Sequence, residues 1–260
     1  MGDTCVDVYR YGQCLRLNPE SPAPLFTEAR ATERPGMAAN VVANVESLSM
    51  SAELVTSRRK ERKERFIDVL YHQQMLRVDS KPDGRIDEID LAQLMLRDDL
   101  KTFDAAIISD YDKGFIEMTG VSKLMDILSI IPLIFVDTKK PFIGGYDRSN
   151  VILKLNESEA ASISHNFPQH QEARLVVTLG AQGARVEKEL VPGFPAQVFD
   201  VCGAGDSFLA ALTLGYLETN DLIEAVKFAN LCASISVGHV GTYAVNWDDI
   251  EIEYERLGII

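Results

Sequence analysis

The sequence lacks the patterns that mark several common classes of protein. Its four cysteines (Cys5, Cys14, Cys202 and Cys232) form no C-x-x-C pair, and its four histidines show no metal-ligand spacing, so neither a zinc site nor a redox dithiol is indicated. No G-x-G-x-x-G follows a first strand, which argues against a dinucleotide-binding oxidoreductase. There is no apolar run of about eighteen residues and no signal peptide, so we expect a cytoplasmic protein without a membrane span.

Basic residues are scarce relative to acidic ones. The chain has 26 Lys and Arg against 39 Asp and Glu, which gives a formal net charge of −13. A protein with this charge is not expected to bind nucleic acid. The densest basic stretch, residues 58–65, is interrupted by two glutamates. It predicts either a solvated connector or a local cationic rim that attracts an anionic substrate.

Short apolar segments alternate with helical patterns in the second half of the chain. Buried strands are predicted at 105–108, 133–136, 151–153 and 175–179, and helices at 86–100, at 118–128 and from residue 157. This alternation predicts an α/β fold with a doubly wound, mainly parallel sheet flanked by helices. Further toward the N-terminus, the patterns predict loops and edge strands over 1–32, a helix over 37–45, and paired strands at 66–70 and 75–79.

The segment from Asp200 to Phe208, D-V-C-G-A-G-D-S-F, is the clearest candidate for chemistry. Gly203 and Gly205 allow backbone N–H groups to converge at the positive end of a helix dipole, where anions bind. Asp206 can accept a proton from a hydroxyl group, while the amides of Gly203, Ala204 and Gly205 stabilise charge on a transferred phosphoryl group. The alternative is an aspartate that only caps the start of a helix.

This segment resembles the C-terminal signature of the ribokinase-like (pfkB) carbohydrate kinases. Other stretches, in the same order along nearly the whole chain, are similar to the D-glycero-β-D-manno-heptose 7-phosphate kinases of that family. They include Gly2-Asp3, Asn18-Pro19-Glu20, Arg34 to Val41, Leu76 to Asp79, Ser109 to Gly114 and Asp137-Thr138-Lys139. The resemblance implies a single ribokinase-like domain over residues 1–260, with a small, reduced β lid built from segments within about 8–35 and 64–80.

The resemblance also implies a reaction. The γ-phosphoryl group of ATP, bound with Mg²⁺, would pass to a hydroxyl group of a small-molecule sugar or sugar phosphate. The best substrate is a heptose 7-phosphate, phosphorylated at its anomeric hydroxyl. Two alternatives stay open: a kinase of another sugar or nucleoside, and a catalytically silent relative that binds a sugar or nucleotide.

Particular residues match functional positions of the family. Asp7, Gly36 and Asn40 match positions that hold sugar hydroxyls; the alternative for Asp7 and Asn40 is turn or helix-packing polarity. Asn156 and Glu159 match a motif that organises Mg²⁺, through water. The same pair also fits the cap of the helix that starts at residue 157.

The nucleotide positions follow from the same resemblance. Thr178, Gly180 and Gly183 match the strand end and turn that accept nucleotide phosphates. Asn230 lies on the helix that flanks adenine in relatives, and Lys154, near a strand end, can neutralise phosphate charge.

Three departures from the family pattern carry expectations of their own. Only Met1 precedes Gly2-Asp3, where most relatives have a hydrophobic strand, so an unpaired strand edge is expected. The connection over 48–65 is short, which implies a reduced lid and leaves open a homodimer through that lid. Cys202 replaces the usual threonine of the signature and is a poorer hydrogen-bond donor.

Overall fold

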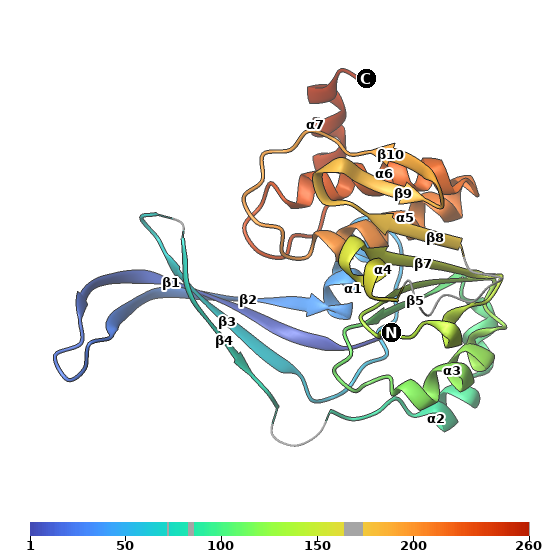
Figure 1. The fold of residues 1–260 in the computed structure, drawn as a ribbon, viewed down its shortest axis with the longest axis horizontal. Helices are drawn as coiled ribbons and strands as arrows, with labels where there is room; N and C mark the ends of the chain where they lie inside the picture. Colours follow the sequence, from blue (N-terminus) through green and yellow to red (C-terminus); the bar gives the residue numbers. More distant parts are fainter. Residues whose placement is uncertain (72, 83–85, 164–173, 260) are drawn as a thin grey trace.

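The computed structural model describes residues 1–71, 73–82, 86–163 and 174–259, which form two β-sheets and the helices around them (Figure 1). The first sheet has the order β2-β1-β3-β4, and the second has the order β10-β9-β8-β7-β6-β5. The strands of the first sheet are β1 (Thr4–Leu17), β2 (Pro24–Met37), β3 (Glu61–Asp68) and β4 (Gln74–Ser80). Those of the second are β5 (Ala105–Asp110), β6 (Leu133–Thr138), β7 (Val151–Asn156), β8 (Arg174–Thr178), β9 (Gly183–Val186) and β10 (Glu189–Pro192).

The six-stranded sheet confirms the predicted doubly wound α/β fold. β5, β6, β7 and β8 pair in parallel, and β9 and β10 extend the sheet with antiparallel pairs. The helices are α1 (Ala38–Ser47), α2 (Leu91–Met95), α3 (Val121–Leu128), α4 (Glu157–Ile163), α5 (Ala204–Thr219), α6 (Leu222–Ser236) and α7 (Trp247–Leu257).

Helices cover both faces of this sheet, which explains its continuous apolar strands. Side chains of α1, α5 and α6 form one core with Phe135, Ile152 and Val176 of the strands. Side chains of α2 and α3 form the other core, with strand residues such as Ile134 and Leu153. Because successive side chains of a strand point to opposite faces, both sets must be apolar. Within the described residues, no helix is both long and apolar enough to cross a membrane.

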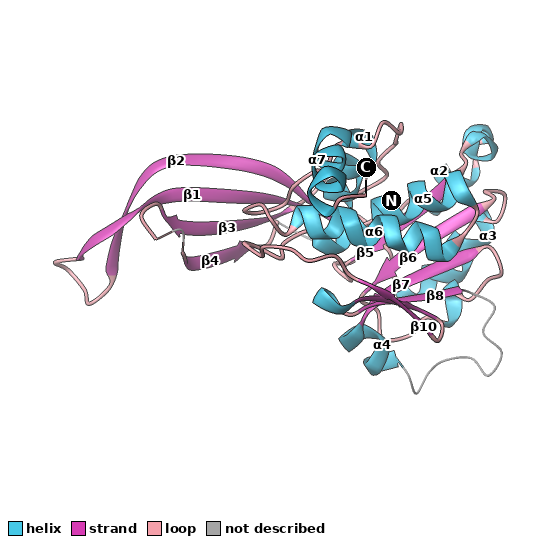
Figure 2. Cartoon of the chain, turned by 90° about the horizontal axis from the view of Figure 1, so that it is seen from above, coloured by secondary structure: helices cyan, strands magenta, loops and turns pink. Residues whose placement is uncertain are grey.

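The four-stranded sheet projects away from this body, as Figure 2 shows. β1 and β2 are each 14 residues long and pair antiparallel from Thr4↔Met37 to Leu17↔Pro24. The expectation of edge strands over residues 1–32 is confirmed for β2, which lies at the edge of the sheet, but the expectation of loops was wrong for β1, which lies inside it. The turn residues between positions 18 and 23 connect β1 to β2. On its other side β1 pairs with β3, and β3 pairs with β4.

The basic stretch is part of this sheet, so the connector hypothesis was wrong for residues 61–65. β3 pairs with β1 on one side and with β4 on the other. The alternation of a strand sends Lys63 and Arg65 toward the helical body, where they approach Tyr111 and Asp7. Arg62, on the opposite face, forms an ion pair with Glu33. The stretch thus presents cations to the candidate site.

The helix predicted over 86–100 is interrupted. Only α2 is α-helical, followed by a 3₁₀ turn at Asp98–Thr102. The side chain of Asp90 caps α2 by accepting hydrogen bonds from the Ala92 and Gln93 amides. Arg97, between the two turns, binds the carboxylates of Glu53 and Asp99 instead of continuing the helix. The spacing of apolar residues over 86–100 does not predict these ionic contacts.

Candidate active site

The turn that leads into α5 has a backbone conformation that favours glycine. Gly203, just before the helix, has φ of 80°, and a Cβ at this position would lie 2.7 Å from Nδ2 of Asn40. A Cβ on Gly205 would lie 3.1 Å from Nζ of Lys154. The two glycines therefore permit a left-handed turn and the close approach of two polar side chains to the start of the helix.

The amides of this turn are not all available to a ligand. The Ala204 N–H donates to the Val201 carbonyl at 3.3 Å, and the Asp206 N–H donates to the Gly203 carbonyl at 3.0 Å. Within the described residues, the Gly203 and Gly205 N–H groups have no protein acceptor. Of the three amides expected to bind an anion, these two remain free to do so.

Asp206 is almost fully buried, with 2% of its surface exposed. Asn40 Nδ2 donates to its Oδ2 at 2.9 Å, and the Tyr111 hydroxyl donates to its Oδ1 at 2.9 Å. Burial raises the pKa of Asp206 from 3.8 to about 6, with a further increase from Asp137; the two hydrogen bonds and Lys154 oppose that rise. A carboxyl group with this pKa is ionised at neutral pH and is well matched to accept a proton.

A buried cation lies opposite the start of α5. Lys154 on β7 is 4% exposed, and its Nζ lies 2.6 Å from Oδ2 of Asp137 on β6. Burial disfavours the charged lysine, but the carboxylates of Asp137, Glu159 and Asp206 together outweigh this effect and raise the pKa of Lys154. The ammonium group and the free amides of Gly203 and Gly205 are all positively polarised, so the space between them suits an anion such as a phosphoryl group.

Tyr111 contacts the candidate base and was given no role from the sequence. It follows β5, and its backbone N–H donates to Asp3 Oδ2 at 2.9 Å. Its ring lies 4.9 Å from Lys139 Nζ and 6.0 Å from Lys63 Nζ. Burial and the charge of Asp206 raise the pKa of Tyr111 well above 10, so its hydroxyl remains a donor. Each oxygen of Asp206 accepts one of these hydrogen bonds and has a second lone pair for an acceptor hydroxyl.

The residues expected to bind sugar are engaged in protein contacts. Asp7 forms a buried ion pair with Arg65, whose Nη2 also lies 3.4 Å from the Cys202 sulfur. Gly36 adjoins this pair, since a Cβ there would overlap Oδ2 of Asp7. Asn40 holds Asp206. The structure therefore brings all three residues toward the glycine-rich turn, and their binding of sugar hydroxyls stays a prediction.

Asn156 and Glu159 form the cap of α4. The Asn156 Oδ1 accepts from the Glu159 N–H at 2.8 Å, and Glu159 Oε2 accepts from the Asn156 N–H at 2.8 Å. Glu159 Oε1 also lies 3.2 Å from Lys139 Nζ. Across the described ranges, no cluster of three or more His, Cys, Asp or Glu side chains could hold a metal ion. This arrangement fits Mg²⁺ held through water and substrate phosphates.

Two of the residues expected to bind nucleotide, Thr178 and Gly180, lie at the carboxyl end of β8. Thr178 ends β8, and its hydroxyl donates to the Leu155 carbonyl at 3.3 Å. Gly180 has φ of 58°, and a Cβ there would meet no atom within 4 Å. Thr178 and Gly180 thus border open space near the end of β7.

The other two residues expected to bind nucleotide, Gly183 and Asn230, contact β10 in this structure, and their nucleotide role stays a prediction. A Cβ on Gly183 would overlap the backbone of Val191 and Gly193, so this glycine permits close contact with β10. The Asn230 side chain donates to the carbonyl groups of Val191 and Pro192, both at 3.1 Å. Its amide group therefore fixes the end of β10 in this structure.

Comparison with known proteins places this geometry in a family. Residues 150–249, which include Lys154, Asn156, Glu159 and the turn at Gly203, match the family described as pfkB family carbohydrate kinase. This stretch of the chain is similar to the pfkB carbohydrate kinases. The match covers the strand ends and the start of α5, where the candidate base and the buried lysine lie.

Curated relatives extend the similarity beyond residues 150–249. A bifunctional protein HldE from Helicobacter pylori is 30% identical over 97% of this chain. Another, from Nitratiruptor sp., is 28% identical over 98% of it. The chain spans 65% and 64% of the length of these two relatives.

Solved structures confirm the ribokinase-like fold. Phosphofructokinase-2 from Escherichia coli, in complex with potassium, has a TM-score of 0.75 at 17% identity, with 98% of this chain and 97% of that chain covered. Ribokinase from Thermotoga maritima has a TM-score of 0.66 at 15% identity, over 98% and 97% of the two chains.

Proposed function

We propose that the protein is an ATP-dependent carbohydrate kinase in which Asp206 is the general base. The observation that carries this proposal is a buried carboxylate with pKa raised to about 6, placed between the free amides of a helix start and a buried lysine. An aspartate that only capped α5 would not need the buried cation of Lys154 nearby. The pfkB family match supports the same chemistry.

The reaction follows from these contacts. The acceptor hydroxyl donates its proton to Asp206, as its oxygen forms a bond to the γ-phosphorus of ATP. The bond between the γ-phosphorus and its bridging oxygen breaks, and ADP leaves with that electron pair. The Gly203 and Gly205 amides and Lys154 stabilise the charge on the transferring group. Asn40 keeps the carboxylate oriented.

We assign the nucleotide and its metal to the neighbouring strand ends. Thr178 and Gly180 would border the phosphates, and Lys154 would contact the transferring group. Asn156 and Glu159 would hold Mg²⁺ through water, and the ion would neutralise phosphate charge during transfer.

The cations around Tyr111 favour an anionic sugar. Lys63 and Lys139 lie over its ring, and Arg65 lies near the Cys202 turn, in a protein of net charge −13. Together with the HldE relatives, they support a heptose 7-phosphate, accepted at its anomeric hydroxyl, as the substrate.

A homodimer through the four-stranded sheet belongs to the same proposal. β4 is exposed along its whole length and carries Met75, Leu76 and Val78 at the surface. A second copy that covers such an edge strand would protect its unpaired backbone groups and its apolar side chains.

The decisive experiment measures ADP release with heptose 7-phosphate, other sugars and nucleosides as acceptors, in the wild type and in Asp206→Asn. We expect the variant to lose about 10²–10⁴-fold in kcat, with ATP binding by calorimetry retained. Asp221→Asn is the matched control, because Asp221 caps the exposed start of α6 and asparagine caps helices equally well.

A second candidate function is a sugar- or nucleotide-binding protein without turnover. The observation that favours this function is that Tyr111 and Asn40 both donate hydrogen bonds to Asp206 and cover it. Wild-type protein that binds ATP and sugar but releases no ADP with any acceptor would establish this alternative.

A further inference from the structure

Arg34 joins the four-stranded sheet to the loop over residues 237–246, which connects α6 to α7. The side chain lies near the end of β2, and its Nη1 donates to the Val240 carbonyl at 3.1 Å and also to the Thr242 carbonyl. Among the described residues, no other donor reaches these two carbonyl groups. Thr242 is buried, and a buried carbonyl group needs a donor. Arg34 therefore fixes the path of this loop.

The loop also contacts the sheet through Tyr9 of β1. The Thr242 N–H donates to the Tyr9 hydroxyl at 3.1 Å, and the Thr242 hydroxyl donates to the Pro35 carbonyl at 3.4 Å. Gly241 has φ of 76°, and a Cβ there would lie 2.5 Å from Cζ of Tyr9. The guanidinium carbon of Arg34 lies 5.7 Å from the centre of the same ring. The loop is therefore held against both β1 and β2.

The other side of the loop contacts the glycine-rich turn. Asp200 accepts from the Gly241 N–H at its Oδ2 and from the Cys202 N–H at its Oδ1, both at 2.9 Å. A Cβ on Gly203 would lie 3.1 Å from Cγ2 of Thr242. The loop that the sheet holds is thus in contact with the turn whose amides remain free to bind an anion.

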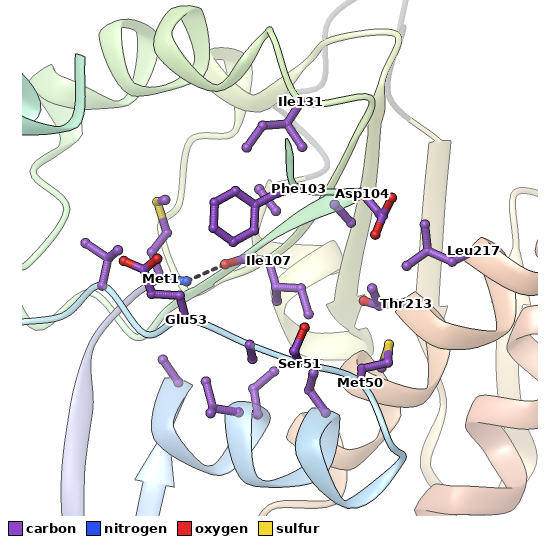
Figure 3. Close-up of a pocket in the computed structure, with 18 of the residues that line it drawn as sticks. Met1, Met50, Ser51, Glu53, Phe103, Asp104, Ile107, Ile131, Thr213 and Leu217 are labelled. Atoms are coloured by element: carbon purple, nitrogen blue, oxygen red, sulfur yellow. Dashed lines mark hydrogen bonds between the residues drawn. The ribbon is translucent and has the colours of Figure 1, made fainter. Parts of the chain in front are cut away.

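These contacts are separate from a cavity beside α1. The cavity, of about 660 Å³, lies between α1 and β5, as Figure 3 shows. Its lining includes Val41 and Val45 of α1, but no residue of β2 and none of the loop over 237–246. The connection from the sheet to the turn therefore does not depend on what fills this cavity.

We propose that Arg34 is a positioning residue, which keeps the Gly203 turn in place by fixing the loop over 240–242 against the four-stranded sheet. The inference rests on the proposed kinase function. The amides of Gly203 and Gly205 must face Lys154 at a set distance, since preorganised donors stabilise charge only where that charge develops. A displacement of about 1 Å at such a site can cost about 10²-fold in rate.

The chemistry of arginine suits this task. Its planar guanidinium group carries five N–H donors and stays charged, so it can serve two carbonyl groups from one position. The alternative role for Arg34 is the attraction of an anionic substrate toward a protein of net charge −13. The two roles differ in the kinetic constant that they affect, because attraction acts on substrate binding whereas positioning of the turn acts on the transferring group.

The first test compares Arg34→Met with Arg30→Met in the ADP-release assay. Arg30 is the matched control, because it lies four residues earlier on the same face of β2 and contacts the Tyr11 ring at 4.1 Å instead of the loop. We expect Arg34→Met to lower kcat at least about tenfold, with KM for ATP and for the acceptor changed less than about threefold. Arg30→Met should change kcat less than about twofold.

The second test does not depend on turnover. The Cys202 amide donates to Asp200, so its hydrogen exchange reports on the link between the loop and the turn. We expect Arg34→Met to speed exchange of the Gly241 and Cys202 amides about tenfold relative to the amides of β7, and Arg30→Met to leave both unchanged. A wild type that releases no ADP would refute the proposed function, whereas this exchange measurement would still decide whether Arg34 holds the turn.

Three results would overturn the proposal. One is an equal kcat for Arg34→Met and Arg30→Met. Another is a loss in Arg34→Met that lies in KM for the acceptor and disappears at about 0.5 M salt, because Arg34 would then act by attraction of the substrate. The third is a Cys202 amide that exchanges equally fast in Arg34→Met and in the wild type.

Discussion

Replacing Tyr111 with phenylalanine is expected to raise the pKa of Asp206 and to make the kinase need a higher pH. The hydroxyl donates to Oδ1 of the buried carboxylate at 2.9 Å, so it stabilises the ionised form. A hydrogen bond to a charged group contributes about 1.5–3 kcal/mol, and part of it survives with the neutral carboxyl. A net loss of about 1.4 kcal/mol corresponds to one pH unit.

This change has a measurable consequence for catalysis. With the pKa of Asp206 moved from about 6 to about 7, the ionised fraction at pH 7 falls from about nine tenths to about half. We expect kcat/KM for the acceptor to fall about twofold at pH 7 and to recover near pH 9, because the carboxylate is then fully ionised. The assay is ADP release from pH 5 to 9 under subsaturating acceptor.

The matched control is Tyr146→Phe. The Tyr146 hydroxyl also donates to a buried carboxylate, Asp110 Oδ2 at 3.0 Å, but this pair lies away from Asp206. We expect Tyr146→Phe to lower the free energy of unfolding without moving the acid limb of the pH profile of kcat/KM. An acid limb that stays in place in Tyr111→Phe, or moves equally in both variants, would refute the reasoning.

Three further predictions concern the same site. Lys154→Met removes the buried cation and leaves Asp137 without its ion pair. We therefore expect kcat/KM in the ADP-release assay to fall about 10²-fold or more. An unchanged kcat/KM would contradict the role of Lys154 in stabilising the transferring group. Gly205→Ala brings a methyl group to 3.1 Å from Lys154 Nζ, so we expect a lower kcat with an unchanged circular dichroism spectrum; full activity would argue against close approach there. Between about pH 4 and 6 the folded protein keeps a proton on Asp206 that the unfolded chain has already released. The free energy of unfolding of the wild type therefore falls as the pH rises through this window, by up to about 3 kcal/mol. Urea unfolding of Asp206→Asn should lack this slope, and an identical pH dependence in both proteins would count against the raised pKa.

The sequence determined the elements whose causes are local. The buried strands of the parallel sheet, the helix after Gly36 and the turn at Gly203 follow from apolar periodicity and from glycine, which act over a few residues. Asp206 could be chosen as the base because the glycine-rich turn and the helix start are contiguous in sequence. The capping pair of Asn156 and Glu159 is local for the same reason.

The tertiary structure alone decided which polar groups meet. Tyr111 lies 95 positions from Asp206, and Asn40 lies 166 positions from it, yet both donate to the same carboxylate. Arg65 belongs to a stretch whose composition indicates a solvated connector, and only the pairing of β3 with β1 buries it beside Asp7. Local patterns fix strands and helices, but the partner of a buried charge depends on which distant segment the fold brings to it, because burial without a partner is costly.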